Sequence, residues 1–332
     1  MTAPAISPEK IMHLTGGVQS VALLGVAVDH EVFTRLERGA MTVDELATAA
    51  SIAPRGAKAL LDGLTGLGLV TVAGGKYGNS PEASTFLVEG KPTALTGMVR
   101  VSVHNIGEWA KFPTAVKTGA PVTSELLEAK DLPFWHLLVP AIAPLQVPAA
   151  QAVVARLDIA RRGPLSILDV GGGSGIYSAI LLGANREARS TQVDWPTVNA
   201  IAKGFVAKFG VAERFHTVDG DFHTADWGTG HDVAIFSNIA HQESPAQNVE
   251  AFRRFRAALN PGGTLVVSEF VVKDDRSGPP QALLFASQML LASREGASWR
   301  EADYRGWLAE AAFKQVSVEP TPGASTLIYA SN

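Results

Sequence analysis

Apolar residues recur along this chain at two different spacings, and the change occurs near residue 165. Before it, most apolar positions lie three or four residues apart, which predicts helices. After it, short apolar runs of strand length alternate with helical segments, which is typical of an α/β fold with a parallel sheet. We therefore expect a mostly helical N-terminal region followed by an α/β domain.

The first half of the N-terminal region has the start and stop signals of two helices. Apolar positions from 11 to 38 predict one helix, which Gly39 ends. Thr42 stands three residues before Glu45, the spacing of a capping box, and therefore predicts the start of the next helix. Ser51 is expected to cap the segment that follows.

A third helix over 55–67 and a hairpin that turns at Gly74 and Gly75 complete a winged-helix pattern. Such a unit binds DNA or forms a dimer interface. Residues 1–100 carry eight Lys or Arg against nine Asp or Glu, and the helix that would enter a groove offers only Arg55 and Lys58. DNA binding usually needs several cations that contact phosphates, so dimerisation or plain packing is favoured.

Prolines interrupt residues 81–150, which predicts short helices joined by turns. Aromatic residues and a methionine collect in the same region and either pack in the core or line an apolar pocket: Phe86, Met98, Trp109, Phe112, Phe134 and Trp135. We expect Trp135 to contact the substrate. No segment is expected to span a membrane, since the longest apolar run considered, 21–28, is far below the roughly 20 residues required.

The most informative segment is LSILDVGGGSG, residues 165–175. It predicts a buried strand over 166–170, a glycine turn, and a helix that starts at Gly175. Glycines at such a turn let a ligand approach the backbone without meeting a Cβ atom, and the helix start directs free N–H groups at the ligand. The order strand, glycine turn, helix therefore predicts a nucleotide-like ligand.

The details of this turn select the ligand. A dinucleotide fingerprint needs a third glycine where this chain has Ile176, and the pattern is instead G-x-G-x-G at Gly171, Gly173 and Gly175. Asp169 precedes the turn, where it would repel a pyrophosphate but could be reached from an ammonium group. The pattern resembles motif I of class I S-adenosylmethionine (SAM) dependent methyltransferases, in which the acid helps to hold the methionine part of SAM.

Two later acids extend the cofactor prediction. Asp194 ends the second predicted strand, where a ribose diol is held in nucleotide-binding sheets, and Trp195 follows it. After the third strand, Asp221 and Phe222 match the G-D-F of the resembled methyltransferases, which implies an acid near the adenine amino group and an aromatic beside the ring. Ser237, at the end of the fourth strand, completes the predicted cofactor set.

A metal site was considered for the acidic loop that holds Asp219, Asp221, His223 and Asp226. Some catechol-type methyltransferases use a divalent ion. The spacing matches no calcium loop, however, and Phe222 interrupts the cluster. We therefore predict no metal.

The fourth strand carries the main chemical candidate. His241 lies just beyond the apolar run DVAIF, at the edge where open α/β sheets place their ligands. The segment 232–270 resembles the O-methyltransferase family of plant phenolics and bacterial polyketides, in which the histidine at this position deprotonates the substrate hydroxyl. Glu269 matches the first acid of that family and is expected to orient the imidazole.

Two features depart from the family pattern. The family usually has His-Asp-Trp, whereas this chain has His241-Gln242-Glu243. The second family acid falls on Ser298, with Glu295 nearby. The remaining substrate residues are expected to be Asn238, beside His241, and Phe285 and Met289, which lie four apart on a predicted helix over 281–299. Two alternating strands near the end of the chain predict an antiparallel hairpin at one sheet edge.

Composition sets outer limits on function. Of the 332 residues, 46% are hydrophobic and 18% charged, which indicates a globular protein, and the net charge of −4 argues against a general nucleic-acid binder. The absence of cysteine excludes disulfides, thiolate zinc sites and cysteine nucleophiles. No signal segment is recognisable, so we expect a cytoplasmic protein.

Together these features predict a Rossmann-like, seven-stranded methyltransferase sheet preceded by a winged-helix domain. The expected domains are 1–100 for dimerisation, 101–155 as a helical linker that contributes to the substrate pocket, and 156–332 for SAM binding. The expected activity is O-methylation of a small aromatic or polyketide-like metabolite by a homodimer. Three alternatives stay open: a C-methyltransferase, an enzyme that keeps SAM but transfers no methyl, and a SAM-sensing winged-helix regulator.

Overall fold

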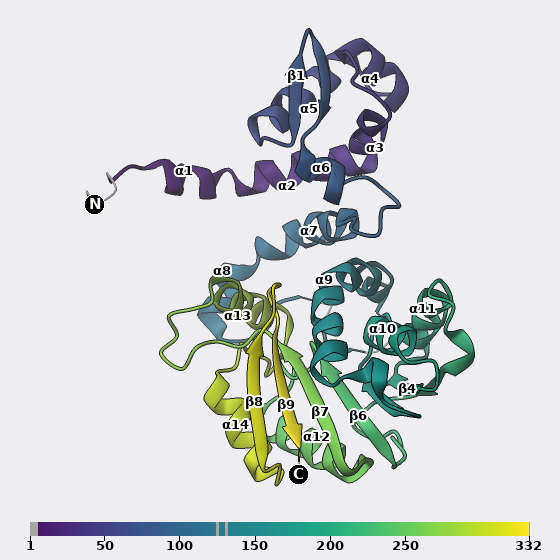
Figure 1. Ribbon diagram of the computed structural model, residues 1–332. Coiled ribbons are helices and arrows are strands. Elements are labelled where there is room, and N and C mark those ends of the chain that lie inside the picture. The colour runs from purple at the N-terminus through teal and green to yellow at the C-terminus, as the bar shows by residue number, and fades with distance from the viewer. Residues whose placement is uncertain (1–5, 124–125, 130–131, 332) are drawn as a thin grey trace, which may run out of the picture. The chain divides into compact units, whose positions relative to one another are not determined.

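The computed structural model describes residues 6–123, 126–129 and 132–331. The chain divides into two compact units, Met1–Gly107 and Glu108–Asn332, which are described separately. Unit 1 contains a small two-stranded sheet and several helices, and unit 2 contains the large sheet and the helices that cover it (Figure 1).

The elements of unit 1 follow in chain order: α1 (Glu9–Thr15), α2 (Gly17–Asp29), α3 (Val32–Glu37), α4 (Val43–Ala50), α5 (Pro54–Gly66), β1 (Val70–Ala73), β2 (Lys76–Asn79), α6 (Pro81–Phe86) and α7 (Thr96–Trp109), which continues into unit 2. The antiparallel pair β1 and β2 confirms the predicted hairpin. The Thr42 and Glu45 capping box at the start of α4 is also confirmed.

Two predictions for unit 1 are wrong. The single helix over 11–38 is three helices, because the chain breaks at Gly16 and again at Glu31, whose left-handed backbone (φ 53°) cannot continue a right-handed helix. Ser51 does not cap the start of a helix. It lies at the C-terminal end of α4 in a left-handed conformation, and Ala53 precedes α5.

Unit 2 starts with α8 (Phe112–Thr118) and α9 (Phe134–Arg156). The expectation of only short helices is wrong for α9, which runs through Pro140, Pro144 and Pro148. Because these prolines are four residues apart, the N–H groups they lack lie along one face, and the other faces keep their hydrogen bonds. Because prolines interrupt its sequence, α9 is not recognisable from the sequence as a long apolar helix.

By length and composition alone α9 is apolar enough to cross a membrane, as are α1 and α2 if that bent pair is counted as one span. Core helices of water-soluble proteins have the same character. In this structure α9 packs against two neighbouring helices, and residues such as Ala143, Ala150 and Val153 on its inner side belong to the core of unit 2.

The rest of unit 2 alternates strands and helices: β3 (Ser166–Val170), α10 (Ile176–Ala184), β4 (Arg189–Asp194), α11 (Pro196–Ala207), β5 (Phe215–Asp219), β6 (His231–Ser237), α12 (Pro245–Ala258), β7 (Leu259–Glu269), α13 (Pro280–Ala292), α14 (Glu301–Glu310), β8 (Gln315–Pro320) and β9 (Thr326–Ser331), with short 3₁₀ turns at Ile159–Arg161 and Ala212–Arg214. The predicted helix over 281–299 therefore ends at Ala292.

The large sheet has seven strands in the order β5-β4-β3-β6-β7-β9-β8, which confirms the predicted Rossmann-like α/β class. The first five strands of this order are parallel, and β9 and β8 add the predicted antiparallel hairpin at one edge. Helices α9, α10 and α11 cover one face of the sheet, and α12 and α14 cover the other. Strand order reverses between β3 and β6, and open α/β sheets bind ligands at such a reversal.

Candidate active site

The predicted site residues gather at one edge of the large sheet. Asp169 lies in β3, Asp194 ends β4, Ser237 ends β6 and Glu269 ends β7. These four strands are parallel, so their carboxyl ends lie at a common edge. The sheet thus brings together acids that are up to a hundred residues apart in the sequence.

The three glycines of the turn after β3 differ in what a side chain would meet at each position. Gly171, Gly173 and Gly175 all have positive φ, from 56° to 71°. A Cβ atom added at Gly171 would lie 2.6 Å from Ile239, and one at Gly175 would lie 2.8 Å from Val206. At Gly173 the nearest atom is 3.8 Å away. The sequence pattern suggests ligand approach as the role of all three glycines, whereas packing within the chain requires two of them and only Gly173 has room for a Cβ atom.

Asp169 is fully buried beneath this turn. Ser178 donates a hydrogen bond to its Oδ2 atom (2.7 Å) and accepts one from Ser190 (2.8 Å). Burial raises the pKa of Asp169 to about 6, against the lowering effect of Ser178. Its Oδ1 atom has no partner among the described residues. A buried carboxylate oxygen without a hydrogen bond lowers the stability of the fold. A cationic group of a ligand would satisfy this oxygen, either directly or through a water that bridges the two.

Asp194 is tied to the glycine turn. Its Oδ2 atom accepts a hydrogen bond from the Gly173 N–H (3.0 Å), and its Oδ1 atom accepts one from the Trp195 N–H (2.8 Å). Burial raises the pKa of Asp194 to about 7, although both N–H groups lower it. The carboxylate therefore contacts the backbone of the one glycine of the motif at which a Cβ atom would have room.

His241 and Glu269 form a buried pair. The imidazole Nδ1 atom lies 2.8 Å from Glu269 Oε2, and the His241 backbone N–H donates to Oε1 at 3.2 Å. Glu269 is fully buried and His241 is 5% exposed. With the carboxylate as acceptor, Nδ1 carries the proton, and Nε2 keeps its lone pair and has no protein partner in the described part of the chain.

Two phenylalanine rings lie close to this imidazole. Phe285, from α13, packs edge-on against the His241 ring with centroids 4.8 Å apart, and the Phe270 ring lies 4.5 Å from that of Phe285. Met289, one turn along α13, is buried. Phe285 and Met289 are predicted substrate residues. Phe270 is not among those predicted, although it directly follows Glu269, the last residue of β7.

Two further substrate candidates are placed differently. Asn238 follows β6 in a left-handed conformation (φ 56°), and its buried Oδ1 atom has no partner among the described residues. Trp135 packs in a cluster with Val139 and Trp195 on the cofactor side. The structure therefore groups Trp135 with a predicted cofactor residue and not with Phe285.

Comparisons with known proteins agree with this geometry. Residues 145–314 match the model of the O-methyltransferase domain, and residues 12–89 match that of the O-methyltransferase dimerisation domain. The chain belongs to the O-methyltransferase family. It is a SAM-dependent O-methyltransferase, and SAM is its cofactor.

Two bacterial relatives of this O-methyltransferase are 30% identical to it. One is the 3-hydroxy-5-methyl-1-naphthoate 3-O-methyltransferase of Streptomyces sahachiroi, with 97% of this chain and 94% of the relative covered. The other is the tetracenomycin polyketide synthesis 8-O-methyl transferase of Streptomyces glaucescens, with 96% and 95% covered. The crystal structure of human N-acetylserotonin methyltransferase with SAM has the same fold, with a TM-score of 0.84, 22% identity and coverage of 100% of this chain and 99% of that one.

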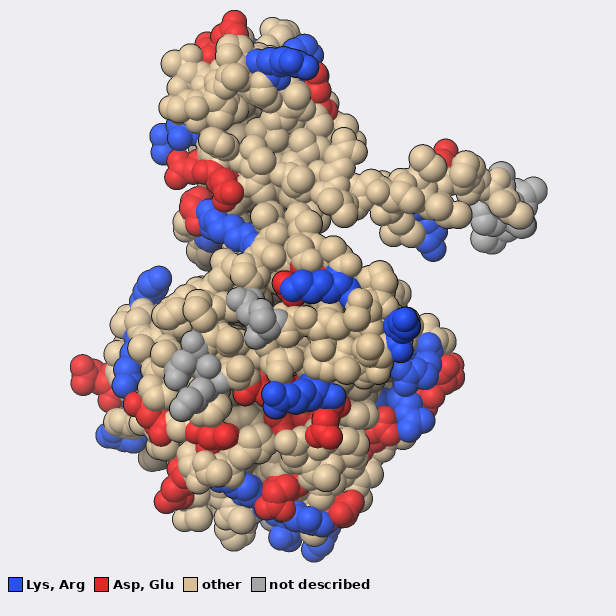
Figure 2. All heavy atoms as spheres, turned by 180° about the vertical axis from the view of Figure 1, so that it is seen from behind, with Lys and Arg blue, Asp and Glu red and all other residues tan. Residues whose placement is uncertain are grey.

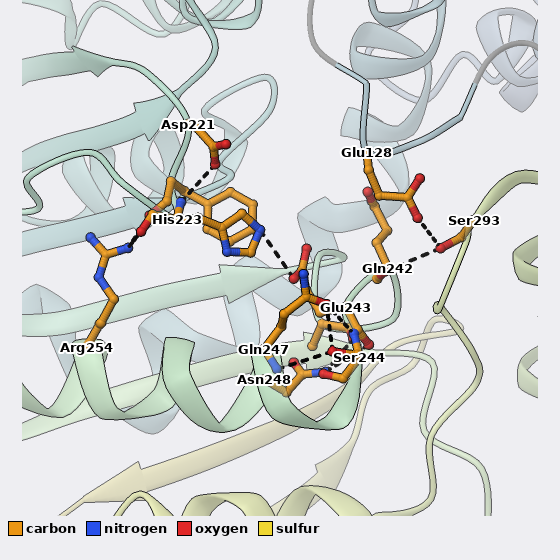
Figure 3. Close-up of polar contacts among 12 residues, drawn as sticks. Glu128, Asp221, His223, Gln242, Glu243, Ser244, Gln247, Asn248, Arg254 and Ser293 are labelled. Carbon is orange, nitrogen blue, oxygen red and sulfur yellow. Dashed lines mark hydrogen bonds and ion pairs between the residues drawn. The ribbon is translucent and has the colours of Figure 1, made fainter.

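The structure shows where the residues that depart from the family pattern, Ser298 and Glu243, lie in this O-methyltransferase. Ser298 is buried, and its hydroxyl has no partner among the described residues. Glu295 is exposed, so it does not replace the second family acid. Glu243 is buried, and its Oε2 atom lies 3.3 Å from Nε2 of His223 (Figure 3).

Residues that the sequence analysis missed hold the loops around the site. The Asn199 amide of α11 donates to the backbone oxygens of Asp194 and Val218 and to Asp219 Oδ1 (2.7 to 3.0 Å). It thereby fixes the ends of β4 and β5 relative to each other. An asparagine inside a helix gives no sequence signal for such a role, because its partners are set by the sheet order.

A second missed residue is Arg254 of α12, which holds the loop after β5. Its guanidinium donates to the backbone oxygens of Phe222, His223 and Ala225, and it lies 4.0 Å from the centroid of the Trp227 ring. The loop with Asp221 and Phe222 is therefore held from its backbone side.

In the part of the chain that the structure describes, side chains of the acidic loop contact protein partners. Asp219 is taken up by Asn199 and His223 by Glu243, and Asp221 accepts the His223 N–H (2.9 Å). Within the described ranges, no three His, Asp or Glu side chains gather as metal ligands would.

Proposed function

We propose that this O-methyltransferase transfers the methyl group of SAM to an aryl hydroxyl of a small, flat aromatic metabolite of polyketide type, with His241 as general base. The observation that carries the proposal is the His241 and Glu269 pair, in which the imidazole Nε2 atom has no partner among the described residues and the ring lies close to two phenylalanine rings. The two bacterial relatives, whose names specify a hydroxynaphthoate and a tetracenomycin polyketide, support the acceptor class.

The mechanism follows from the tautomer that Glu269 imposes. Bound SAM supplies an activated methyl group on its sulfonium sulfur. His241 Nε2 would accept the hydroxyl proton of the acceptor, whose oxygen would then be nucleophilic enough to receive that methyl group. Glu269 then stabilises the imidazolium through Nδ1–H, as a carboxylate does in other His-acid pairs.

The cofactor contacts are also a proposal. We assign the methionine end of SAM to Asp169, whose buried Oδ1 atom lacks a partner. The ribose hydroxyls are assigned to Asp194, and Gly173 provides the close approach. The adenine ring is assigned to the Phe222 ring and to Asp221. Trp195 and Ser237 border the same sheet edge, and Gly171 and Gly175 support it through packing.

We propose that the acceptor lies against Phe285 and Met289 with its hydroxyl toward His241. A flat ring suits this position, since aromatic pairs stack or pack edge to face. The unpartnered amide oxygen of Asn238 would accept a second donor from the substrate. Trp135 would border the pocket from the cofactor side.

The direct test is His241→Ala assayed with a panel of hydroxynaphthoate, other phenolic and polyketide-type acceptors. We expect kcat to fall by about 10² to 10⁴ fold, the usual contribution of a general base, with unchanged affinity for S-adenosylhomocysteine (SAH). His216→Ala is the control, because that histidine is exposed in β5. An unchanged rate in His241→Ala refutes the base role, and product NMR shows whether the methyl is on oxygen or carbon.

We propose that residues 1–100 form the dimerisation domain of a homodimer. The matched dimerisation domain supports this, as does α1, which buries none of its residues within the chain. Ile11, Met12 and Leu14 are each about two-thirds exposed. Figure 2 shows charges of both signs interspersed over unit 2, and α1 carries one acidic residue and one lysine, Glu9 and Lys10, beside these exposed apolar side chains.

The dimer proposal is tested by light scattering on Leu14→Asp, which should have the mass of one chain while the unaltered protein has that of two. Val72→Asp is the matched control, since Val72 is half exposed on the hairpin. A dimer that survives Leu14→Asp would exclude this helix from the interface.

A further inference from the structure

Glu243 is a buried carboxylate two residues after the proposed base. Its backbone is held at the start of α12: the Asn248 amide donates to its carbonyl (3.2 Å), and Ser244, the next residue, caps the helix. The side chain is 6% exposed, so the charge is largely withdrawn from water. Among the described residues, its one ion-pair partner is His223, with Nε2 3.3 Å from Oε2, although this contact lacks hydrogen-bond geometry. A buried carboxylate needs such a partner.

His223 belongs to the loop on the cofactor side. Its ring lies 4.2 Å from that of Phe222, centroid to centroid, with the planes tilted by 30°. Arg254 holds its backbone from α12, the same helix whose N-terminus fixes Glu243. Figure 3 shows the imidazole bridging the space between the loop after β5 and the turn after β6. The contact therefore joins the proposed adenine loop to the turn that holds His241.

We infer that His223 and Glu243 form a positioning pair for the cofactor: with His223 protonated, the pair holds the Phe222 ring in the orientation that receives adenine. The inference rests on the proposed placement of adenine against Phe222. His223 does not touch the reacting atoms in this scheme. It acts through Phe222, so it is a positioning residue and not a catalytic one.

The charges around His223 set the sign of its pH dependence. Contact with Glu243 raises the pKa of His223 above its ordinary value, Asp221 adds to this, and burial and Arg254 oppose it. An imidazole whose pKa is raised in the fold keeps its favourable contact at low pH and loses it as the pH rises through the raised value. Cofactor affinity from the pair should thus be present at about pH 6 and absent at about pH 9.

The test is calorimetric titration of SAH into the unaltered protein and His223→Gln at these two pH values. The quantity to compare is the ratio of the variant's Kd to that of the unaltered protein at the same pH, because titration of Asp194 or of the SAH amino group then cancels. Since His223 is 39% exposed, we expect a ratio of about two- to five-fold at pH 6, the range of a screened ion pair, and about one at pH 9. His216→Gln, an exposed histidine of the same strand region, should give a ratio of one at both.

Glu243→Gln keeps the side-chain shape and should reproduce the same ratios. In the double variant the two effects should not add, since each substitution removes one contact. Ratios that do not change with pH, or single effects that add in the double variant, overturn the pair. If Glu243→Gln does not fold, His223→Gln decides alone. Failure of the unaltered protein to bind SAH at either pH overturns the proposed cofactor site itself, a result distinct from binding with a flat ratio.

Discussion

The two functions found within the glycine turn predict opposite phenotypes for two similar substitutions. Gly173→Ala and Gly175→Ala each add one methyl group at a residue with positive φ, which costs roughly 1 to 2 kcal/mol for an L-residue. At Gly173 nothing else opposes the methyl within the chain. At Gly175 it would lie 2.8 Å from Val206 and 3.3 Å from Phe215, and overpacking adds about 1 to 3 kcal/mol.

We therefore expect Gly173→Ala to lose about 1 to 2 kcal/mol of unfolding free energy and Gly175→Ala about 2 to 5 kcal/mol. Urea unfolding followed by circular dichroism measures both. The effects on SAH affinity, measured on the folded protein, should have the opposite order. Gly173→Ala should weaken SAH binding by about tenfold or more, because its methyl projects where the cofactor is proposed to approach.

Gly183→Ala is the matched control. Gly183 lies near the C-terminal end of α10, the helix that follows the turn, and a Cβ atom there meets nothing within 4 Å. Alanine should leave SAH affinity unchanged and stabilise the helix by up to about 1 kcal/mol. The reasoning fails if Gly173→Ala binds SAH as the unaltered protein does, or if both turn variants lose equal stability.

Three more predictions address the acids and the loop anchor. Glu269→Gln removes the carboxylate that fixes the His241 tautomer and should lower kcat by about 10² to 10⁴ fold at unchanged SAH affinity; an unaffected kcat contradicts the pairing. Burial raises the pKa of Asp194 from its ordinary 3.8 to about 7 in the fold, so the free energy of unfolding falls as the pH rises from about 4 to about 7 and this penalty is constant at higher pH. Urea unfolding should show the stability gained by Asp194→Asn, relative to the unaltered protein, growing between about pH 4 and 7, and a constant difference would argue against the raised pKa. Arg254→Ala leaves three loop carbonyls without their donor and should weaken SAH binding several-fold by calorimetry through a less ordered Phe222; unchanged affinity would show that the loop holds itself.

The sheet could be predicted from the sequence because its parallel strands are short apolar runs, three of which end in an acid. Buried parallel strands are apolar on both faces, so Ser166–Val170 and His231–Ser237 are recognisable without neighbours. The helices were harder. Apolar spacing continues smoothly across Gly16, where the chain nevertheless turns, and the prolines of α9 read as breaks although their missing N–H groups share one face.

Within the site, the proximity of residues in one familiar segment could be predicted, and contacts between separate loops could not. His241 and Glu269 were recognisable as neighbours because Glu269 ends β7 and His241 lies in the turn after the adjacent strand β6. The contact between His223 and Glu243 depends on two loops meeting above the sheet, and their spacing in the sequence contains no sign of it. The glycines show a related limit: a G-x-G-x-G pattern does not reveal whether a missing Cβ makes room for a ligand or for Val206.

The position of β9 has a consequence for synthesis on the ribosome. Although β9 comes after β8 in the chain, it lies between β7 and β8 in the sheet. Until residues 326–331 have left the exit tunnel, β7 presents an unpaired edge beside a nearly complete apolar sheet. Exposed edges of this kind recruit other strands. A nascent chain paused just before β9 would therefore be the form most in need of a chaperone.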